Sequence, residues 1–247
     1  MGSFFTDTLC FDHEVALFDL DPKRLRYVFN TVRMSKVEEI ADFDPELVIN
    51  CVTIKNTIAA FDLVTPYLSE RCIISDIASV KTGLPEYYAA QKRPYVSTHP
   101  MFGPTFATLS DLRSHNAIII AESDFMGKMF FKELYRSLKL NIFEYTFEEH
   151  DETIAYSLSI PFATNLAFAS VMKHQEAPGT TFKKQMMIAE GLLSEDDYLL
   201  QEILFNPYTS EQLIRIQKQL AVLQQIVEKK DALAMRDFLA LARKNIE

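Results

Sequence analysis

LVINCV at residues 47–52 and CIISDI at residues 72–77 are the two stretches that decide the fold of this chain. Both are nearly continuous apolar runs, as expected of strands whose two faces are covered by helices. Residues 55–69, between them, have the spacing of a helix with one apolar face, formed by Ile58, Phe61, Leu63, Val64 and Leu68. A strand, a helix and a second strand in this order predict a βαβ unit with parallel strands.

The same alternation of short β-branched runs and helical stretches extends over the first two-thirds of the chain. Further strands are expected at residues 13–19, 95–99, 117–121 and 141–146. The pattern predicts an α/β domain over residues 1–147, in which helices cover both faces of a mostly parallel sheet.

The character of the sequence changes after residue 147, where no further strand is indicated. Glu148 and Glu149 open a long amphipathic helix that is expected to reach about residue 174. Three more amphipathic segments follow, at residues 182–193, 195–204 and 210–246. Residues 148–247 are therefore predicted to form an all-helical domain, and its apolar faces are too wide to be buried within so small a bundle. We expect this domain to form a homodimer.

Composition limits the classes of function. The 247 residues carry 25 Lys and Arg against 34 Asp and Glu, a formal charge of −9, which disfavours nucleic acid as a partner. No uninterrupted apolar run approaches the roughly 18 residues of a membrane-spanning helix, and no secretory leader opens the chain. Three cysteines, Cys10, Cys51 and Cys72, lie in apolar runs, which predicts reduced, buried thiols in a cytoplasmic protein.

The N-terminal residues have the pattern of the second half of a dinucleotide-binding βαβ unit. In such a unit a glycine-rich turn and a helix N-terminus meet the pyrophosphate, and an acidic residue roughly 20 positions later binds the ribose. Gly2 leads into a helix-like stretch and then a strand that ends at Asp19. The spacing predicts a Rossmann-like domain that prefers NAD to NADP, because a carboxylate repels a 2′-phosphate. The alternative is that Asp19 and Asp21 form a turn or cap the next helix.

The first strand and the first two glycines of the Gly-x-Gly-x-x-Gly fingerprint have no counterpart before Gly2. Without that strand, buried backbone groups on its two neighbours lack partners, at a cost of about 1 to 3 kcal/mol each. We therefore expect the natural protein to begin about ten to fifteen residues upstream, the length of a strand and a turn. The N-terminally truncated chain is expected to bind NAD weakly or not at all.

Two polar constellations lie at the carboxyl ends of predicted strands, where open α/β sheets place their ligands. In DIASVK, residues 76–81, Ser79 and Lys81 are suited to hold a hydroxyl or an anion, although a helix cap at Ser79 and a solvated Lys81 explain the string equally. In HPMFGP, residues 99–104, His99 precedes a proline, which keeps it in extended backbone. Its imidazole is a natural proton acceptor near neutral pH, but a lone histidine is more often structural.

These two strings, followed by a helical region that opens with His150 and Asp151, resemble the prephenate dehydrogenase family of tyrosine biosynthesis. The resemblance extends in order and spacing over nearly the whole chain, and HPMFGP is its most specific part. It implies oxidative decarboxylation of prephenate to 4-hydroxyphenylpyruvate, with hydride transfer to NAD. A single base and correct orientation suffice, because aromatisation of the ring drives the reaction.

The resemblance also implies roles for individual residues. His99 is the base, and Ser79 binds the substrate hydroxyl or the His99 imidazole. Gly2, Asp19, Thr53 and Asp76 are assigned to the cofactor. Lys81, Lys183 and Lys184 are assigned to the substrate, and no metal is expected. His150 and Asp151 are interpreted as a helix cap and charge pair.

The sequence departs from the family where an arginine is expected to grip a substrate carboxylate. Residues 182–191 contain Lys183 and Lys184 but no arginine, and lysine lacks the two-pronged geometry of a guanidinium group. Relatives also carry histidines in the long helix where this chain has Ser159 and Phe162. Three alternatives therefore stay open: an arogenate dehydrogenase, a non-catalytic dimerising or ligand-sensing remnant, and an enzyme for β-hydroxy acids that uses Lys183 or Lys184.

Overall fold

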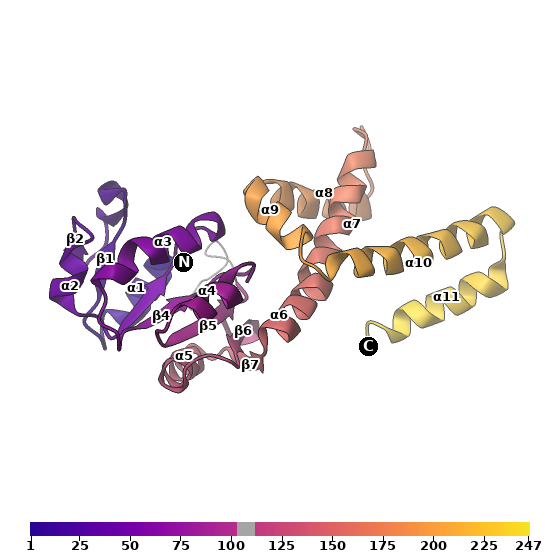
Figure 1. Cartoon of the computed structure of the whole chain (residues 1–247). Coiled ribbons are helices and arrows are strands. Elements are labelled where there is room, and N and C mark those ends of the chain that lie inside the picture. Colours follow the sequence, from indigo (N-terminus) through magenta and orange to yellow (C-terminus); the bar gives the residue numbers. More distant parts are fainter. Residues whose placement is uncertain (103–111) are drawn as a thin grey trace. The chain divides into compact units, whose positions relative to one another are not determined.

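A computed structural model describes residues 1–102 and 112–247 of the chain (Figure 1). Gly103 and Pro104, the end of the HPMFGP string, lie outside the described residues. The chain divides into two units, Met1–Asp151 and Glu152–Glu247. The sequence predicted a division between residues 147 and 148, so His150 and Asp151 belong to the first unit instead of opening the second.

The first unit contains two β-sheets. One sheet pairs β1 (Ala16–Phe18) with β2 (Val32–Met34). The other has the order β3 (Leu47–Asn50), β4 (Ile73–Asp76), β5 (Tyr95–Pro100), β6 (Asn116–Ile120) and β7 (Asn141–Tyr145). Only the β5–β6 pair is antiparallel among the strands described, which confirms the mostly parallel sheet. β2 was not predicted, because three residues with a central arginine are too few to show an alternation of apolar and polar residues.

The division into two sheets falls between β1 and β3. Within the described residues, β1 pairs only with β2, and β3 pairs only with β4, so each strand leaves one edge without a ladder of hydrogen bonds. A doubly wound sheet places one further parallel strand between two such neighbours.

Helices cover both faces of the sheets, as the apolar runs predicted. They are α1 (Gly2–Leu9), α2 (Glu39–Phe43), α3 (Thr57–Val64), α4 (Leu84–Ala90), α5 (Phe125–Ser137) and α6 (Phe147–Ile154). One core joins α1 and α5 to Leu47 and Ile49 of β3, and the other joins α2, α3 and α4 to Val48. Successive residues of β3 therefore pack in opposite cores, as expected of a strand buried on both faces.

Gly127 allows α5 to approach the sheet closely. A Cβ atom at this position would lie 2.8 Å from Cβ and Cγ1 of Val96, which is buried in β5. We predict that Gly127→Ala lowers the free energy of unfolding by about 1 to 3 kcal/mol, because the core is overpacked. Urea denaturation measures the change. Gly191→Ala, on a helix position with open space around it, is the control and should not destabilise the chain.

The second unit is all-helical, as predicted. It contains α7 (Ile160–Val171), α8 (Thr180–Leu193), α9 (Asp197–Leu204), α10 (Thr209–Lys229) and α11 (Ala232–Lys244). A π-helical segment, Ala155–Ser159, separates α6 from α7. Pro161 stands just after it in the first turn of α7 and cannot donate the backbone hydrogen bond that a continuous α-helix requires. The predicted long helix is therefore one helical stretch, Phe147–Val171, with a π-helical segment inside it.

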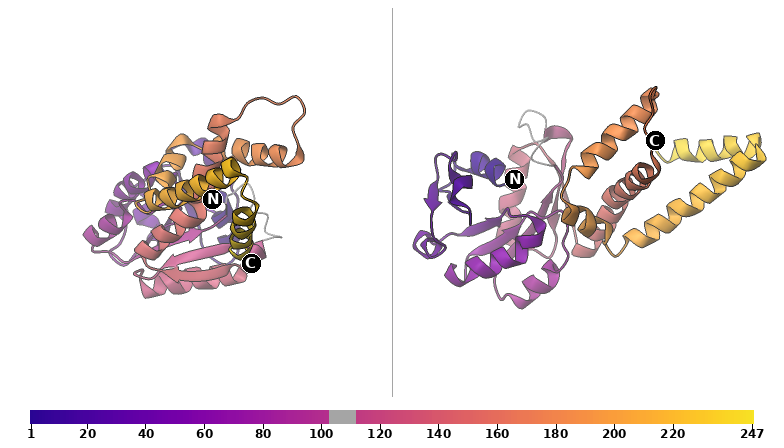
Figure 2. Two further views of the ribbon diagram at one scale, coloured as in Figure 1. Left: turned by 90° about the vertical axis from the view of Figure 1, so that its right-hand side faces the viewer. Right: turned by 90° about the horizontal axis from the view of Figure 1, so that it is seen from above.

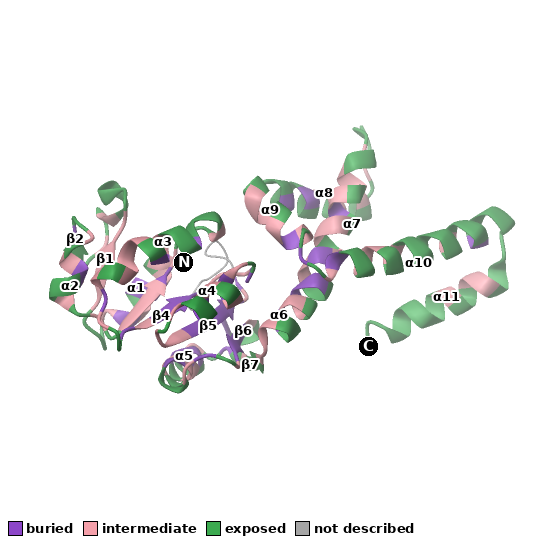
Figure 3. Cartoon of the chain, in the orientation of Figure 1, coloured by how far each residue is buried: buried purple, intermediate pink, exposed green. Residues whose placement is uncertain are grey.

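One predicted helix of the second unit, residues 210–246, is two helices. Lys230 ends α10 in the left-handed conformation, with φ of 53°, and the Asp231 side chain accepts hydrogen bonds from Leu233 N and Ala234 N at the start of α11. Figure 2 shows α10 and α11 as a helical hairpin. No residue of α11 is buried, and Figure 3 shows its exposed surface.

The helical stretch Phe147–Val171 is long and apolar enough to cross a membrane by length and composition, with a mean hydropathy of 1.3. Polar residues are spaced along this stretch, so it contains no long uninterrupted apolar run and was not predicted as a possible membrane span. Core helices of soluble proteins satisfy the same criterion, so a single helix of this kind is weak evidence for a membrane span. The absence of a membrane span stays a prediction.

Candidate active site

A row of polar residues lies at the carboxyl ends of the central parallel strands. Asn50 of β3 pairs in register with Asp76 of β4, and Asp76 pairs with Ser97 of β5. All three are buried. The two strands that decided the fold therefore place Asp76 at the sheet edge where α/β proteins bind ligands.

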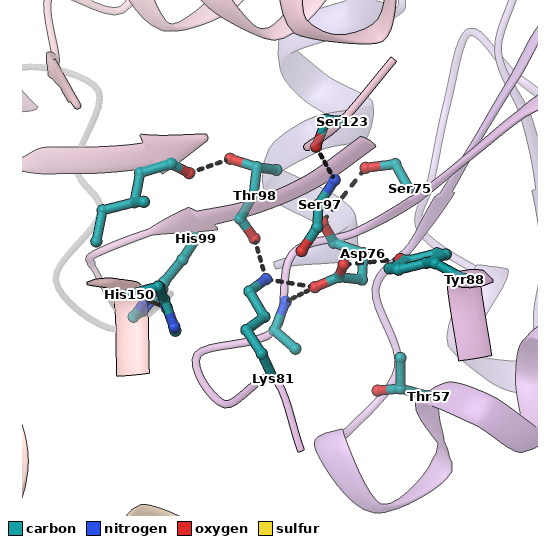
Figure 4. Close-up of polar contacts among 12 residues, drawn as sticks. Thr57, Ser75, Asp76, Lys81, Tyr88, Ser97, Thr98, His99, Ser123 and His150 are labelled. Atoms are coloured by element: carbon teal, nitrogen blue, oxygen red, sulfur yellow. Dashed lines mark hydrogen bonds and ion pairs between the residues drawn. The ribbon is translucent and has the colours of Figure 1, made fainter. Parts of the chain in front are cut away.

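Asp76 is the centre of a buried hydrogen-bonded cluster. Its Oδ1 lies 2.5 Å from Lys81 Nζ and accepts a hydrogen bond from Ala78 N, while its Oδ2 accepts one from Tyr88 OH at 2.8 Å. Lys81 Nζ also donates to the Thr98 carbonyl oxygen at 2.8 Å, as Figure 4 shows. Burial lowers the pKa of Lys81, and the Asp76 carboxylate opposes that shift. The same burial, together with the carboxylate, raises the pKa of Tyr88.

This cluster holds the end of β5, where His99 lies. Thr98, the preceding residue, donates its hydroxyl to the Ile118 carbonyl oxygen at 2.7 Å and contacts Tyr135 OH at 2.9 Å. Lys81 donates to the Thr98 carbonyl oxygen, so both the side chain and the backbone of Thr98 are held by hydrogen bonds. The backbone of His99 is therefore anchored by buried contacts on its N-terminal side.

The His99 side chain contacts His150 of α6, which in turn contacts Asp151. Its Nδ1 lies 3.1 Å from Nε2 of His150, and Nδ1 of His150 lies 3.0 Å from Oδ1 of Asp151. His99 is only 6% exposed and His150 is fully buried. Burial lowers the pKa of both imidazoles, helped at His99 by the positive charges of His150, when protonated, and Lys81. Both rings are consequently neutral at pH 7.

The structure bears on two residues of the DIASVK string. Lys81 was interpreted as a substrate ligand or a solvated side chain, but it is 1% exposed and its charge is already paired with Asp76. Ser79, half-buried in the same string, was expected to bind either the substrate hydroxyl or His99, and no hydrogen bond joins it to His99. His150 occupies the Nδ1 side of His99 instead.

The residues assigned to the cofactor lie at the ends of strands or at a helix N-terminus. Gly2 is the first residue of α1, whose N-terminus has no side-chain cap, and a Cβ there would lie 3.6 Å from Cβ of Cys51, just beyond β3. Asp19 directly follows β1 and uses Oδ1 to accept a hydrogen bond from Asp21 N at 2.8 Å, which leaves its second oxygen for a ribose hydroxyl. Thr53 is exposed after β3, and its Oγ1 accepts a hydrogen bond from Asn56. Asp76 has both oxygens engaged by the chain itself.

The remaining candidates lie in the second unit. Lys183 and Lys184 are exposed on α8. Ser159 is buried and donates its hydroxyl to the Ile203 carbonyl oxygen at 2.8 Å. Its side chain therefore supports the packing of the helices. No cluster of metal-ligating side chains occurs in the described residues.

Comparison with known proteins decides the family. The model of the nucleotide-binding domain of prephenate dehydrogenase matches residues 6–140, more than half of the chain. The chain belongs to the prephenate dehydrogenase family. A search of curated proteins gives no significant match. His99 and the Asp76 cluster lie within the matched nucleotide-binding domain.

Solved structures of prephenate dehydrogenases have the same fold. The enzyme of Aquifex aeolicus superposes with a TM-score of 0.82 at 16% identity, covering 99% of this chain and 95% of that one. A second structure of it, in complex with hydroxyphenyl propionate and NAD+, gives a TM-score of 0.81 at 18% identity, covering 100% and 95%. Synechocystis arogenate dehydrogenase gives 0.79 at 14% identity, covering 98% and 94%. Both specificities therefore occur on this fold.

Proposed function

We propose that the chain belongs to an enzyme that catalyses the NAD-dependent oxidative decarboxylation of prephenate to 4-hydroxyphenylpyruvate in tyrosine biosynthesis. The observation that carries the proposal is the buried imidazole of His99, held at the carboxyl end of β5 inside the nucleotide-binding domain of the family, where burial holds its pKa well below its usual value. A base that is unprotonated at neutral pH is the one group that this chemistry requires from the protein.

In the proposed reaction the protein supplies the base, and the cofactor supplies the hydride acceptor. His99 takes the proton of the ring hydroxyl as the hydride leaves the carbon that bears it. The bond to the departing carboxyl group supplies its electron pair to the ring, carbon dioxide leaves, and the proton returns to the oxygen of the phenol. NAD, when bound, accepts the hydride. Low exposure of His99 keeps bulk water from competing for the base.

The test is the appearance of NADH with prephenate, on the chain itself and on a version extended before Met1 by a strand and a Gly-x-Gly turn. The extension is included because no Gly-x-Gly precedes Gly2. We expect turnover by the extended protein and little by the shorter one. Absence of turnover by both, with a cooperative unfolding transition intact, would favour the non-catalytic dimerising or ligand-sensing module.

Arogenate is the second candidate substrate, because α8 offers lysines and no arginine to a substrate carboxylate. Losing the paired contact of an arginine weakens binding by about 1.5 to 3 kcal/mol unless Lys183 or Lys184 replaces it. The ratio of kcat/KM for prephenate to that for arogenate decides between them. NAD and NADP are compared in the same assay, since Lys23 and Arg24 follow Asp19 and counter its repulsion of a 2′-phosphate.

We further propose that the protein is a cytoplasmic homodimer joined through the helical unit. Apolar side chains are exposed along α10 and α11, among them Leu220, Val227, Leu233 and Leu241. An exposed apolar face of this extent is typical of a protein interface. The three cysteines are free thiols, in keeping with a reducing compartment.

Sedimentation equilibrium tests the dimer. The expected mass is twice the 28.4 kDa of one chain. Leu220 and Val227 are seven residues apart on α10 and share a face, so the double variant L220E/V227E should sediment as a monomer. The variant Q219E/Q225E adds the same charge at exposed polar positions of α10 and should remain a dimer. A wild-type monomer at micromolar concentration would contradict the proposal.

A further inference from the structure

His150 and Asp151 take no part in the reaction described above. His150 of α6, 51 residues along the chain from His99, contacts His99 directly, and Asp151 contacts His150. A buried His–His pair is costly unless the donors and acceptors alternate, since two N–H groups or two lone pairs facing each other leave both unsatisfied. The order of donors and acceptors along Asp151, His150 and His99 can therefore be derived.

The Asp151 carboxylate sets the order of donors and acceptors. Ionised Asp151 only accepts hydrogen bonds, so Nδ1 of His150 carries a proton and donates it to Oδ1 over 3.0 Å. A neutral His150 then has its lone pair on Nε2. That lone pair faces Nδ1 of His99 at 3.1 Å, so Nδ1 of His99 must be the donor. A neutral His99 with its proton on Nδ1 has its lone pair on Nε2.

We propose that His150, oriented by Asp151, is a positioning residue that fixes His99 in the Nδ1–H tautomer and so makes His99 Nε2 the base. The inference rests on the proposed function, and it names the atom that takes the hydroxyl proton. When Nε2 accepts that proton, His99 becomes an imidazolium whose Nδ1–H still donates to His150. Nε2 later returns the proton to the phenol oxygen, so the pair ends each cycle in its starting state.

The charged groups around His99 support this direction of polarisation. Asp151 of α6 is the carboxylate at the far end of the chain of hydrogen bonds, and it favours positive charge on His150. Lys81, which follows β4, opposes charge on both imidazoles, and Asp76 of β4 partly neutralises Lys81. The resting pair is therefore neutral, and the carboxylate stabilises the imidazolium only when it forms.

The tautomers are measured directly, without substrate. Long-range ¹H–¹⁵N correlation spectra of the protein at pH 7.5, assigned with single His→Gln variants, distinguish a protonated from an unprotonated ring nitrogen. We expect both His99 and His150 to be Nδ1–H tautomers, whereas exposed His174 serves as the control and should show the Nε2–H form that free imidazole side chains prefer. An Nε2–H tautomer at either His99 or His150 would overturn the proposal.

Kinetics on the extended protein supply the second readout. His150→Leu removes the acceptor, and kcat should fall about 10- to 100-fold, the usual effect of losing a partner that orients a functional histidine. KM should change less than about threefold, because the substrate does not touch His150. His150→Gln keeps an oxygen acceptor near the position of Nε2 and should recover most of kcat. Equal losses in the Leu and Gln variants would contradict a positioning role.

The two proposals fail in different ways. If both rings are Nδ1–H tautomers but neither prephenate nor arogenate is turned over, the arrangement of the histidines stands and the proposed function is wrong. If turnover is found but His99 is an Nε2–H tautomer in the resting protein, the function stands and the assignment of Nε2 as the base is wrong.

Discussion

His99→Asn is expected to lower kcat by about 10²- to 10⁴-fold, the contribution of a positioned general base. Asparagine cannot take up the proton of the ring hydroxyl. Its amide NH₂ group lies where Nδ1–H lies in histidine and still donates to His150, so the variant should fold normally. The measurement is steady-state NADH formation by the extended protein, with far-ultraviolet circular dichroism as a check on folding.

The pH profile separates the loss of a base from a loss of structure. Burial holds the pKa of His99 well below its usual 6.5, so the wild type should keep constant kcat above that pH and lose activity only in more acidic solution. The asparagine variant should lack this acidic decline. His174→Asn, a substitution at an exposed histidine, should leave kcat unchanged. A His99→Asn variant with more than about one-tenth of wild-type kcat would remove His99 as the base.

Strands buried on both faces were the elements most easily predicted from sequence. β3 and β4 are continuous apolar runs because both faces meet helices, and no other local arrangement produces such runs around an amphipathic helix. β2 has only three residues, and its pairing with β1 depends on tertiary contacts. The break after Lys230 was also missed, although Asp231 is a recognisable N-cap, because the apolar period continues through it.

The site was predictable in its residues but not in its contacts. Asp76 and His99 follow strands, and the topology of a parallel sheet brings strand ends together without further information. The sequence could not indicate that Lys81 turns inward, because a lysine five residues after an aspartate is ordinarily solvated. It also could not indicate that His150 meets His99, since a contact between residues 51 positions apart depends on where α6 begins. The histidine and aspartate beside each other were the available signal, and they were interpreted only as a cap.

Lys81→Met should destabilise the protein by about 3 to 5 kcal/mol, because it leaves the Asp76 carboxylate buried without its partner. Both side chains of this pair are fully buried, and Tyr88 and the backbone N–H of Ala78 donate to the carboxylate without neutralising it. Urea denaturation at pH 7.5 gives the free energy of unfolding. Lys132→Met is the matched control: Lys132 pairs with Glu144 at 2.6 Å near the surface, and its loss should cost less than about 1 kcal/mol.

A double-mutant cycle tests whether the cost arises from the unpaired charge or from the lost lysine stem. Asp76→Asn removes the charge and keeps one oxygen, which can accept from Ala78 N, while its NH₂ group replaces Oδ2 and can donate to the Tyr88 hydroxyl oxygen. The double variant Asp76→Asn/Lys81→Met should therefore be more stable than Lys81→Met alone by more than about 1 kcal/mol, a coupling of the size found between contacting groups. If the two single losses simply add, the ion pair is not what holds this cluster together. The double variant also loses the Lys81 contact to the Thr98 carbonyl oxygen, so a reduced kcat in a stably folded double variant would show that this anchor of β5 positions His99.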